Sequence, residues 1–91
     1  MVERARVLFG KQVRSLREER KLSQEKLAEL CHVHRNYPGR VERAEVNIRF
    51  DYVLALAYGL QVRPEKLFQL VQVPRTPPRL TKTKKKAWEA R

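Results

Sequence analysis

Apolar residues recur every three or four positions along the first part of the chain, the spacing that amphipathic helices show. The first such group consists of Leu8, Phe9, Val13 and Leu16. Arg and Glu occupy other faces of the segment, which predicts an amphipathic helix over residues 5–20. Ser23 is a favourable N-cap for a second helix over residues 24–31, whose inward positions would be Leu27, Ala28 and Cys31.

The same spacing continues further along the chain. Phe50, Val53, Leu56, Ala57 and Leu60 predict a helix over residues 49–58, ended by Gly59 or Gln61. Pro64 suits the first position of a last helix, whose apolar side would hold Leu67, Phe68 and Leu70. No alternating β pattern is present, so the pattern predicts an all-α, five-helix fold.

A third helix is expected between these pairs, and its sequence is unusual. Only two residues, His32 and Val33, separate the second helix from it, so the two should cross steeply, as in a helix-turn-helix. Pro38 and Gly39 are poor residues for a helix interior. A start late enough to place Pro38 among the first positions removes the hydrogen-bond penalty. We therefore predict a shortened helix over residues 38–43, with residues 35–37 in a looser first turn and Tyr37 displaced from helical angles.

The charge of the chain indicates a polyanionic partner. Lys and Arg number 21 against 10 acidic residues, a formal net charge of +11 over 91 residues. Residues 74–91 hold seven of the basic residues and one acid, and three of their first five residues are proline. We expect residues 1–73 to form the domain and residues 74–91 to be a disordered basic tail.

Other classes of site and compartment are disfavoured. One cysteine permits no internal disulfide, and no segment is long and apolar enough for a membrane span, so we expect a cytoplasmic protein. Cys31, His32 and His34 lie close together, but they match no zinc spacing, and we expect no metal, cofactor or small-molecule ligand. Paired carboxylates, a nucleophile beside a base and a phosphate-binding glycine loop are all lacking, which argues against an enzyme.

The helix-turn-helix segment, about residues 23–43, resembles the lambda-repressor and Cro-like family, also called the xenobiotic-response-element family. The matching positions are Leu22-Ser23-Gln24-Glu25, Leu27-Ala28, Val33, Val41-Glu42-Arg43, Asn47, Leu56, Ala57, Leu60, Val62, Pro64 and Leu67-Phe68. A narrower resemblance is to the controller proteins of restriction-modification operons. It rests on His34-Arg35-Asn36-Tyr37, Gly39, Val41-Glu42-Arg43 and Asn47-Ile48. The sequence departs from the family at His32 and Ala44, where glycine is usual, so left-handed backbone would be strained there.

A recognition helix needs long polar side chains on one face and apolar ones on the other. Our candidates for base reading are Arg35, Asn36, Tyr37 and Arg40, because Arg can pair with guanine and Asn with adenine. Tyr37 could instead pack against the domain. The resemblance implies DNA backbone contacts for Gln24, Arg43, Asn47 and Arg49, and a partly buried ion pair between Arg17 and Glu42.

Some apolar residues remain once the core positions are assigned, namely Leu54, Tyr58, Leu70 and Val71. Related domains dimerise through this region, so these residues are our candidates for a homodimer interface. In the tail, Lys82, Lys84, Lys85 and Lys86 could follow the DNA backbone without sequence preference.

The sequence therefore predicts a homodimeric regulator of transcription that binds a short, partly palindromic operator in double-stranded DNA and controls its own operon. The alternative is an antitoxin that neutralises a partner protein and regulates itself through the same helix-turn-helix. No sequence feature supplies the separate partner-binding segment that an antitoxin requires, since residues 74–91 hold few apolar anchors.

Overall fold

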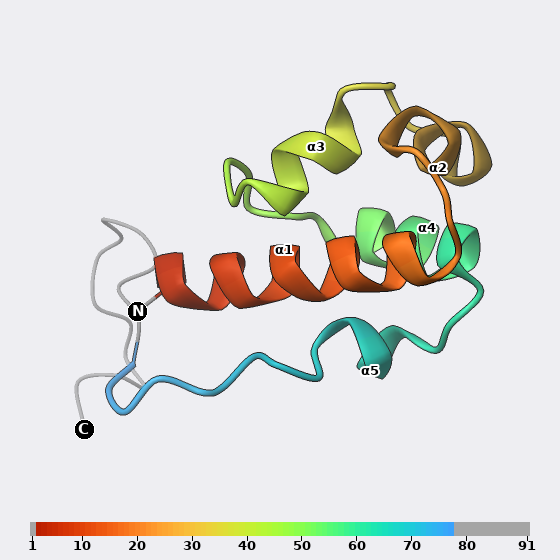
Figure 1. Ribbon diagram of the computed structural model, residues 1–91. Helices are drawn as coiled ribbons and strands as arrows, with labels where there is room; N and C mark the ends of the chain where they lie inside the picture. Colours follow the sequence, from red (N-terminus) through yellow and green to blue (C-terminus); the bar gives the residue numbers. More distant parts are fainter. Residues whose placement is uncertain (1, 78–91) are drawn as a thin grey trace.

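The fold is a small bundle of five helices (Figure 1). The computed structural model describes residues 2–77, and no β-strand occurs among them. The helices are α1 (Val2–Glu19), α2 (Gln24–Cys31), α3 (Tyr37–Glu42), α4 (Phe50–Leu60) and α5 (Pro64–Leu67). The predicted all-α, five-helix fold is confirmed, whereas the expected disordered tail lies almost entirely outside the described residues. No helix within this part of the chain is long and apolar enough to cross a bilayer.

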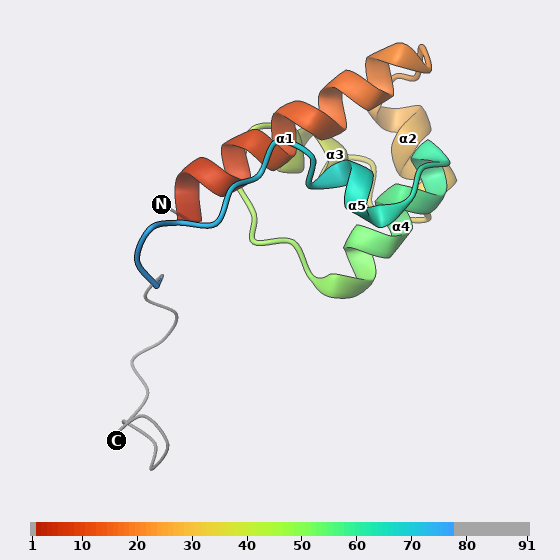
Figure 2. The same ribbon diagram turned by 90° about the horizontal axis from the view of Figure 1, so that it is seen from below.

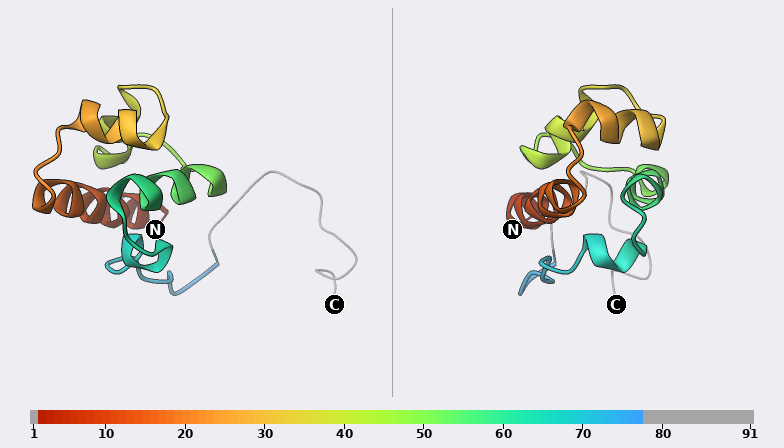
Figure 3. Two further views of the ribbon diagram at one scale, coloured as in Figure 1. Left: turned by 90° about the vertical axis from the view of Figure 1, so that its right-hand side faces the viewer. Right: turned by 45° about the vertical axis from the view of Figure 1, so that its right-hand side comes forward.

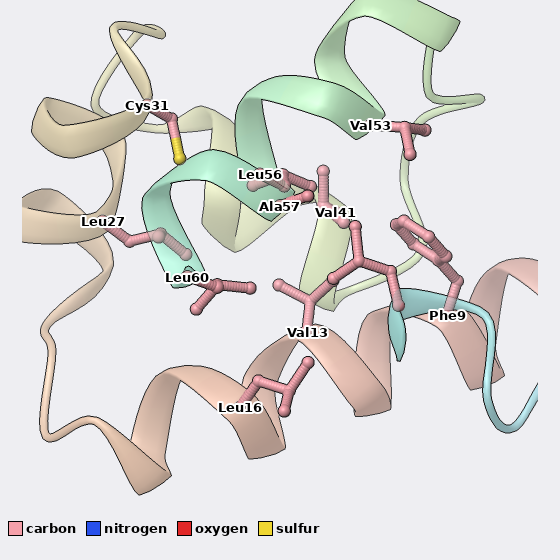
Figure 4. Packing of buried hydrophobic residues seen from close by; sticks show 11 residues of the cluster. Phe9, Val13, Leu16, Leu27, Cys31, Val41, Val53, Leu56, Ala57 and Leu60 are labelled. Atoms are coloured by element: carbon pink, nitrogen blue, oxygen red, sulfur yellow. The ribbon is translucent and has the colours of Figure 1, made fainter. Parts of the chain in front are cut away.

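One apolar core joins all five helices (Figure 4). Its fully buried side chains include Val13 of α1, Leu27 of α2, Leu56 and Leu60 of α4, and Leu67 of α5. Val41 is the buried side chain through which α3 enters this cluster. Because the helices are short, this shared burial, rather than intrinsic propensity, accounts for their formation. The recognition segment is thereby fixed to a rigid base.

The helices α2 and α3 lie on one side of the long helix α1, and α5 lies on the other (Figures 1 and 3). After α5, residues 68–77 run back beside α1 toward the N-terminus (Figure 2). Two contacts hold this return. The rings of Phe9 and Phe68 lie 5.0 Å apart. The buried Gln12 amide donates to the Lys66 carbonyl at 3.0 Å and to the Gln69 side chain at 3.2 Å.

Several predicted boundaries and burial assignments were wrong. Helix α1 begins at Val2 rather than residue 5, because apolar spacing is blind to the exposed first turn, where Glu3 suits the helix dipole. Phe50 was placed in the core, but 78% of its surface is exposed. Gly59 does not end α4. It lies inside the helix, facing the Cys31 sulfur. The other predicted stop, Gln61, is confirmed, because it is the C-cap that follows Leu60.

Four helices end in left-handed residues that are not glycine. These residues are Lys21, His32, Ala44 and Gln61, with φ between 57° and 62°. After α3, the amide of Glu45 donates to the Arg40 carbonyl at 2.9 Å and that of Ala44 to the Val41 carbonyl at 3.0 Å, the pattern of a Schellman motif. The strain predicted at His32 and Ala44 is therefore present, since a Cβ disfavours this backbone.

Glycine is used instead where helices approach closely. No described glycine has a positive φ. A Cβ on Gly10 of α1 would lie 2.6 Å from the Val41 carbonyl oxygen and 2.8 Å from that of Glu42. These are sub-van-der-Waals distances to backbone, so only glycine allows α1 to pack this tightly against the end of α3.

Candidate nucleic-acid interface

The recognition helix α3 accommodates its proline near its N-terminus. Pro38 is the second residue of the helix, a position whose N–H has no partner inside a helix. The His34 carbonyl accepts the amide of Tyr37 at 2.9 Å, so it is not left without a donor. Pro38 is fully buried. The shortened helix is thus observed, but Tyr37 is its first helical residue and is not displaced from helical angles as we had expected.

Gly39, although a poor helix residue, lies where two side chains leave little room for a Cβ. A Cβ there would lie 2.9 Å from the Gln24 side-chain oxygen and 3.0 Å from an Arg43 nitrogen. Gly39 is buried in the body of α3, so it allows the start of α2 to approach α3 rather than adding flexibility.

The candidate base-reading residues fall into two groups. Arg35, Asn36 and Arg40 are exposed, whereas the residues of α3 between them and the core, Pro38, Gly39 and Val41, are buried. Arg35 and Asn36 in the turn before α3, together with Arg40 in the helix, therefore form a polar edge facing solvent, and the helix has an apolar side fixed to the domain. Tyr37 is half-buried, and its ring packs edge-on against Tyr52 of α4 at 4.6 Å. Burial and this neighbour raise the pKa of the Tyr37 phenol.

The turn before α3 holds a hydrogen bond that the sequence pattern did not reveal. The His34 Nδ1 accepts the backbone N–H of Asn36 at 3.1 Å. Asn36 is the N-cap of α3, although its own side chain makes no capping bond. The imidazole thus satisfies a backbone donor beside the helix start, the task that a capping side chain performs.

A polar network joins α1, α2 and the end of α3. The Arg17 Nε donates to the Glu42 Oε2 at 2.6 Å, and its Nη2 to the Oε1 at 3.2 Å. The third donor of the guanidinium, Nη1, reaches the Leu22 carbonyl at 2.8 Å. Gln24 completes the network by donating to the Glu42 Oε1 at 3.0 Å. Arg17 and Glu42, which were predicted to form an ion pair, are therefore in contact. Gln24, a candidate contact to the DNA backbone, donates a hydrogen bond to the same carboxylate.

The other residues predicted to contact the DNA backbone lie around the loop between α3 and α4. The Asn47 side chain accepts from Arg6 at 2.9 Å. Arg49 pairs with Asp51 at 3.0 Å and lies 5.6 Å from the centre of the Tyr52 ring. Arg43 pairs with Glu45 at 2.8 Å. These side chains are exposed on the rim of the recognition segment, whereas Lys82, Lys84, Lys85 and Lys86 lie outside the described residues.

Glu45 was missed by the sequence reasoning. Its carboxylate lies 2.8 Å from the Arg43 Nε and 3.9 Å from the Arg40 Nε, and both of these residues are candidate DNA contacts. The Arg43 guanidinium lowers the pKa of this carboxyl, so the acid remains charged beside the two arginines. The spacing Arg-x-Glu was a usable signal, since it recurs at Arg63 and Glu65.

The residues predicted for a dimer interface differ in how far their side chains are exposed. Leu54 and Tyr58 of α4 are exposed, by 46% and 76%, and Leu70 is exposed as well. Val71 is only partly exposed, because it packs against the core. Phe50 joins Leu54 and Tyr58 at four-residue spacing, so the exposed apolar face of α4 is longer than the prediction.

The three residues once weighed as a metal site do not form one. Cys31 faces the core beside Gly59, and burial raises the pKa of its thiol to about 11. His32 and His34 are exposed. Within residues 2–77 no group of three or more His, Cys, Asp or Glu side chains is arranged to hold a metal ion.

Comparison with known proteins agrees with this architecture. A family model described as a helix-turn-helix domain matches residues 8–70, so the chain belongs to the helix-turn-helix family. Within the family its relatives include controller proteins. It is 35% identical over 74 residues to the control protein C.BamHI of Bacillus amyloliquefaciens, an alignment that covers 80% of this chain and 91% of that protein. It is 42% identical over 60 residues to the control protein C.SmaI of Serratia marcescens, covering 66% of this chain and 71% of that one.

A solved structure gives the same result. The restriction-modification controller protein C.AhdI of Aeromonas hydrophila superposes with a TM-score of 0.68 at 43% identity, over 69% of this chain and 96% of that one. The predicted resemblance to lambda-repressor-like regulators, and to controller proteins among them, is confirmed. The chain is a DNA-binding helix-turn-helix protein of the class that regulates transcription, and this class does not consist of enzymes.

Proposed function

We propose that the protein acts as a homodimer on a short, partly palindromic operator and regulates its own operon, in the manner of a restriction-modification controller. The observation that carries this proposal is the polar edge of α3. Arg35 and Asn36, directly before α3, and Arg40 within it are exposed, and the buried Pro38, Gly39 and Val41 anchor the six-residue helix. A rigidly held edge with Arg and Asn side chains is suited to the major groove.

The roles within this surface follow from burial. Arg35 and Arg40 would pair with guanine and Asn36 with adenine. Tyr37, whose ring is engaged by Tyr52, would contact a base or sugar mainly through its hydroxyl end. Gln24, Arg43, Asn47 and Arg49 surround the edge and would bind phosphates, which fixes the register of the helix without reading sequence.

The partner for dimerisation would be the α4 surface of a second copy. Phe50, Leu54 and Tyr58 form an exposed apolar face along one side of α4, and Leu70 is a further candidate. A two-fold axis through this face would present two α3 helices to successive major grooves, about one DNA turn of 34 Å apart. The operator should then contain two inverted half-sites at that spacing.

The chain outside the domain would add affinity only. We propose that residues 1–73 are the DNA-binding domain and that residues 74–91 act as an arm, in which Lys82, Lys84, Lys85 and Lys86 bind phosphates. Removal of residues 75–91 should weaken binding to all sequences equally. A change in the preferred sequence would contradict this assignment.

Selection of bound duplexes from a random DNA pool tests the function directly. The proposal predicts an inverted repeat whose half-sites are recognised by α3. Arg35→Ala and Arg40→Ala should each relax the preference at one position of the half-site, with a cost of about 1–3 kcal/mol there. A pool without any enriched sequence would overturn the proposal, as would enrichment that these two variants leave unchanged.

The dimer is tested separately by sedimentation. Leu54→Glu should yield monomers that bind a single half-site weakly, because a charge cannot be buried in an apolar interface without a partner. Val7→Glu is the matched control, since Val7 is 40% exposed on α1, on the side that also carries the exposed Lys11 and Arg14. A wild-type protein that remains monomeric at micromolar concentration would exclude the proposed interface.

A further inference from the structure

The carboxylate of Glu45 lies between two arginines on the rim of the recognition helix. Its distances to the Arg43 and Arg40 Nε atoms are 2.8 Å and 3.9 Å. All three side chains are about half exposed, at 46% for Glu45, 58% for Arg43 and 52% for Arg40. A phosphate that approached either guanidinium would therefore compete with a carboxylate that is already bound.

The backbone fixes this position. Ala44 adopts φ 62°, which turns the chain back at the end of α3, and the Glu45 amide then bonds to the Arg40 carbonyl at 2.9 Å. The Glu45 side chain is thus returned beside the last turn of the helix from which Arg40 projects. Because the motif is held by backbone hydrogen bonds, the acid stays close to both arginines in the folded protein.

Helix stability gives no reason for an acid at this place. Asp51 and Glu65 also pair with an arginine two residues earlier, but they lie in the first turns of α4 and α5, where the helix dipole favours negative charge. Glu45 follows the C-terminus of α3, where the dipole disfavours it. Within residues 2–77 its charged partners are Arg40 and Arg43, so its effect falls on these two side chains.

We propose that Glu45 is a specificity-determining residue, which occupies Arg43 and Arg40 and gives them up only when a docked recognition helix brings a phosphate to Arg43 and a guanine edge to Arg40. This inference rests on the proposed function. On unrelated DNA, exchange of the carboxylate for a loosely placed phosphate gains little, so Arg43 and Arg40 contribute little affinity. On the operator, base contacts hold the phosphate in place, so replacement of the Glu45 carboxylate by this phosphate becomes favourable. Glu45 thus suppresses non-specific binding more than specific binding.

Glu45→Gln tests the inference, because it keeps the shape of the side chain and removes its charge. Affinity is measured by fluorescence anisotropy on the selected operator and on a scrambled duplex of equal length, over a range of salt concentrations. The variant should bind scrambled DNA about threefold to fivefold more tightly, the range that an exposed ion pair permits, with a smaller gain on the operator. The slope of log K against log salt on scrambled DNA should steepen by about one.

Glu65→Gln is the matched control. It removes the same charge from an equally short pair, 2.7 Å from Arg63, on the opposite side of α1 from α3 (Figure 1). It should leave the ratio of operator to scrambled affinity unchanged. If both variants changed this ratio equally, long-range charge would explain the result, and the inference would be wrong.

A double variant identifies the route of the effect. In an Arg43→Gln background, Glu45→Gln should lose most of its influence on scrambled DNA, because the principal partner is gone. An undiminished influence in that background would overturn the assignment to Arg43, as would an equal gain on both duplexes in the single variant. Wild-type protein that fails to discriminate the operator would refute the proposed function itself, whereas discrimination that survives Glu45→Gln unchanged would refute this inference alone.

Discussion

Arg17 of α1 and Glu42 of α3 form a bidentate ion pair whose side chains are only 12% and 4% exposed. The pair connects the longest helix of the domain to the end of the recognition helix. The hydrogen bonds to Glu42 raise the pKa of the Arg17 guanidinium, which therefore remains charged. Because Gln24 bonds to the same carboxylate, the start of α2 is tied to this point as well.

Removal of one member of this pair should destabilise the fold. Arg17→Ala leaves the Glu42 carboxylate buried without a cation, and we expect a loss of about 3–5 kcal/mol in the free energy of unfolding, measured with urea. Arg17→Lys keeps the charge and should lose less. Arg14→Ala is the control, because the Arg14–Glu18 pair is exposed and should contribute less than about 0.5 kcal/mol. Equal unfolding free energies for Arg17→Ala and Arg14→Ala would show that the Arg17–Glu42 pair does not stabilise the fold.

A glycine at the end of α3 should stabilise the protein. Ala44→Gly relieves a left-handed residue at φ 62°, with an expected gain of about 1 kcal/mol in unfolding free energy. Ala55→Gly, in the interior of α4, should instead cost about 1 kcal/mol, since helical backbone gives glycine no advantage. Opposite shifts in the urea midpoint would confirm the contrast, and a loss of stability at both positions would show that Ala44 is not strained.

A methyl group at Gly10 should disturb the packing of α1 against the end of α3. In Gly10→Ala the new Cβ would lie 2.6 Å from the Val41 carbonyl oxygen, and that oxygen also accepts the Ala44 amide. We expect a loss of about 1–3 kcal/mol from overpacking, together with a shift of the Val41 and Ala44 amide signals in NMR spectra. Ser15→Ala, on the exposed side of α1, should leave both quantities unchanged. If the amide signals near α3 did not shift, the close contact between Gly10 and Val41 would be refuted.

The buried thiol of Cys31 should make stability fall at high pH. Burial raises the pKa of the thiol in the folded protein to about 11, above the value of about 8.5 for an unfolded chain. Its contribution is therefore fully present below the unfolded pKa and is lost as pH rises from there through the folded pKa. Between pH 8 and 11 the wild type should lose about 3 kcal/mol more than Cys31→Ala, which lacks the group. Parallel pH profiles of the two proteins would exclude the effect.

The fold was predictable because its signals are local or periodic. Apolar spacing identified α1, α2, α4 and α5, and α3 was expected from its place after a two-residue turn. Ser23 marked the start of α2, and Pro64 that of α5. The exposure of Phe50 was not predictable, because its position continues the apolar repeat of α4 and only packing decides which side of a helix is covered.

The candidate site was predictable as a segment but not as a set of contacts. The sequence indicated that the recognition segment carries Arg35 and Asn36 in the turn before α3 and Arg40 within it, and that Pro38 shortens the helix. The packing of Tyr37 on Tyr52 and the approach of Glu45 to Arg40 depend on how distant or turned segments meet. The spacing of residues along the chain does not reveal such tertiary contacts.

The sequence by itself determined the helices, the excess of positive charge and the polar residues of the recognition segment, since each depends on residue type and spacing along one element. Only the tertiary structure decided how the glycines are used. Glycine is expected where the chain turns, yet Ala44 and His32 take the left-handed turns and Gly10 lies within a helix. The physical reason is that a turn can tolerate a Cβ at a cost of about 1 kcal/mol, whereas a carbonyl oxygen at 2.6 Å leaves no room for one.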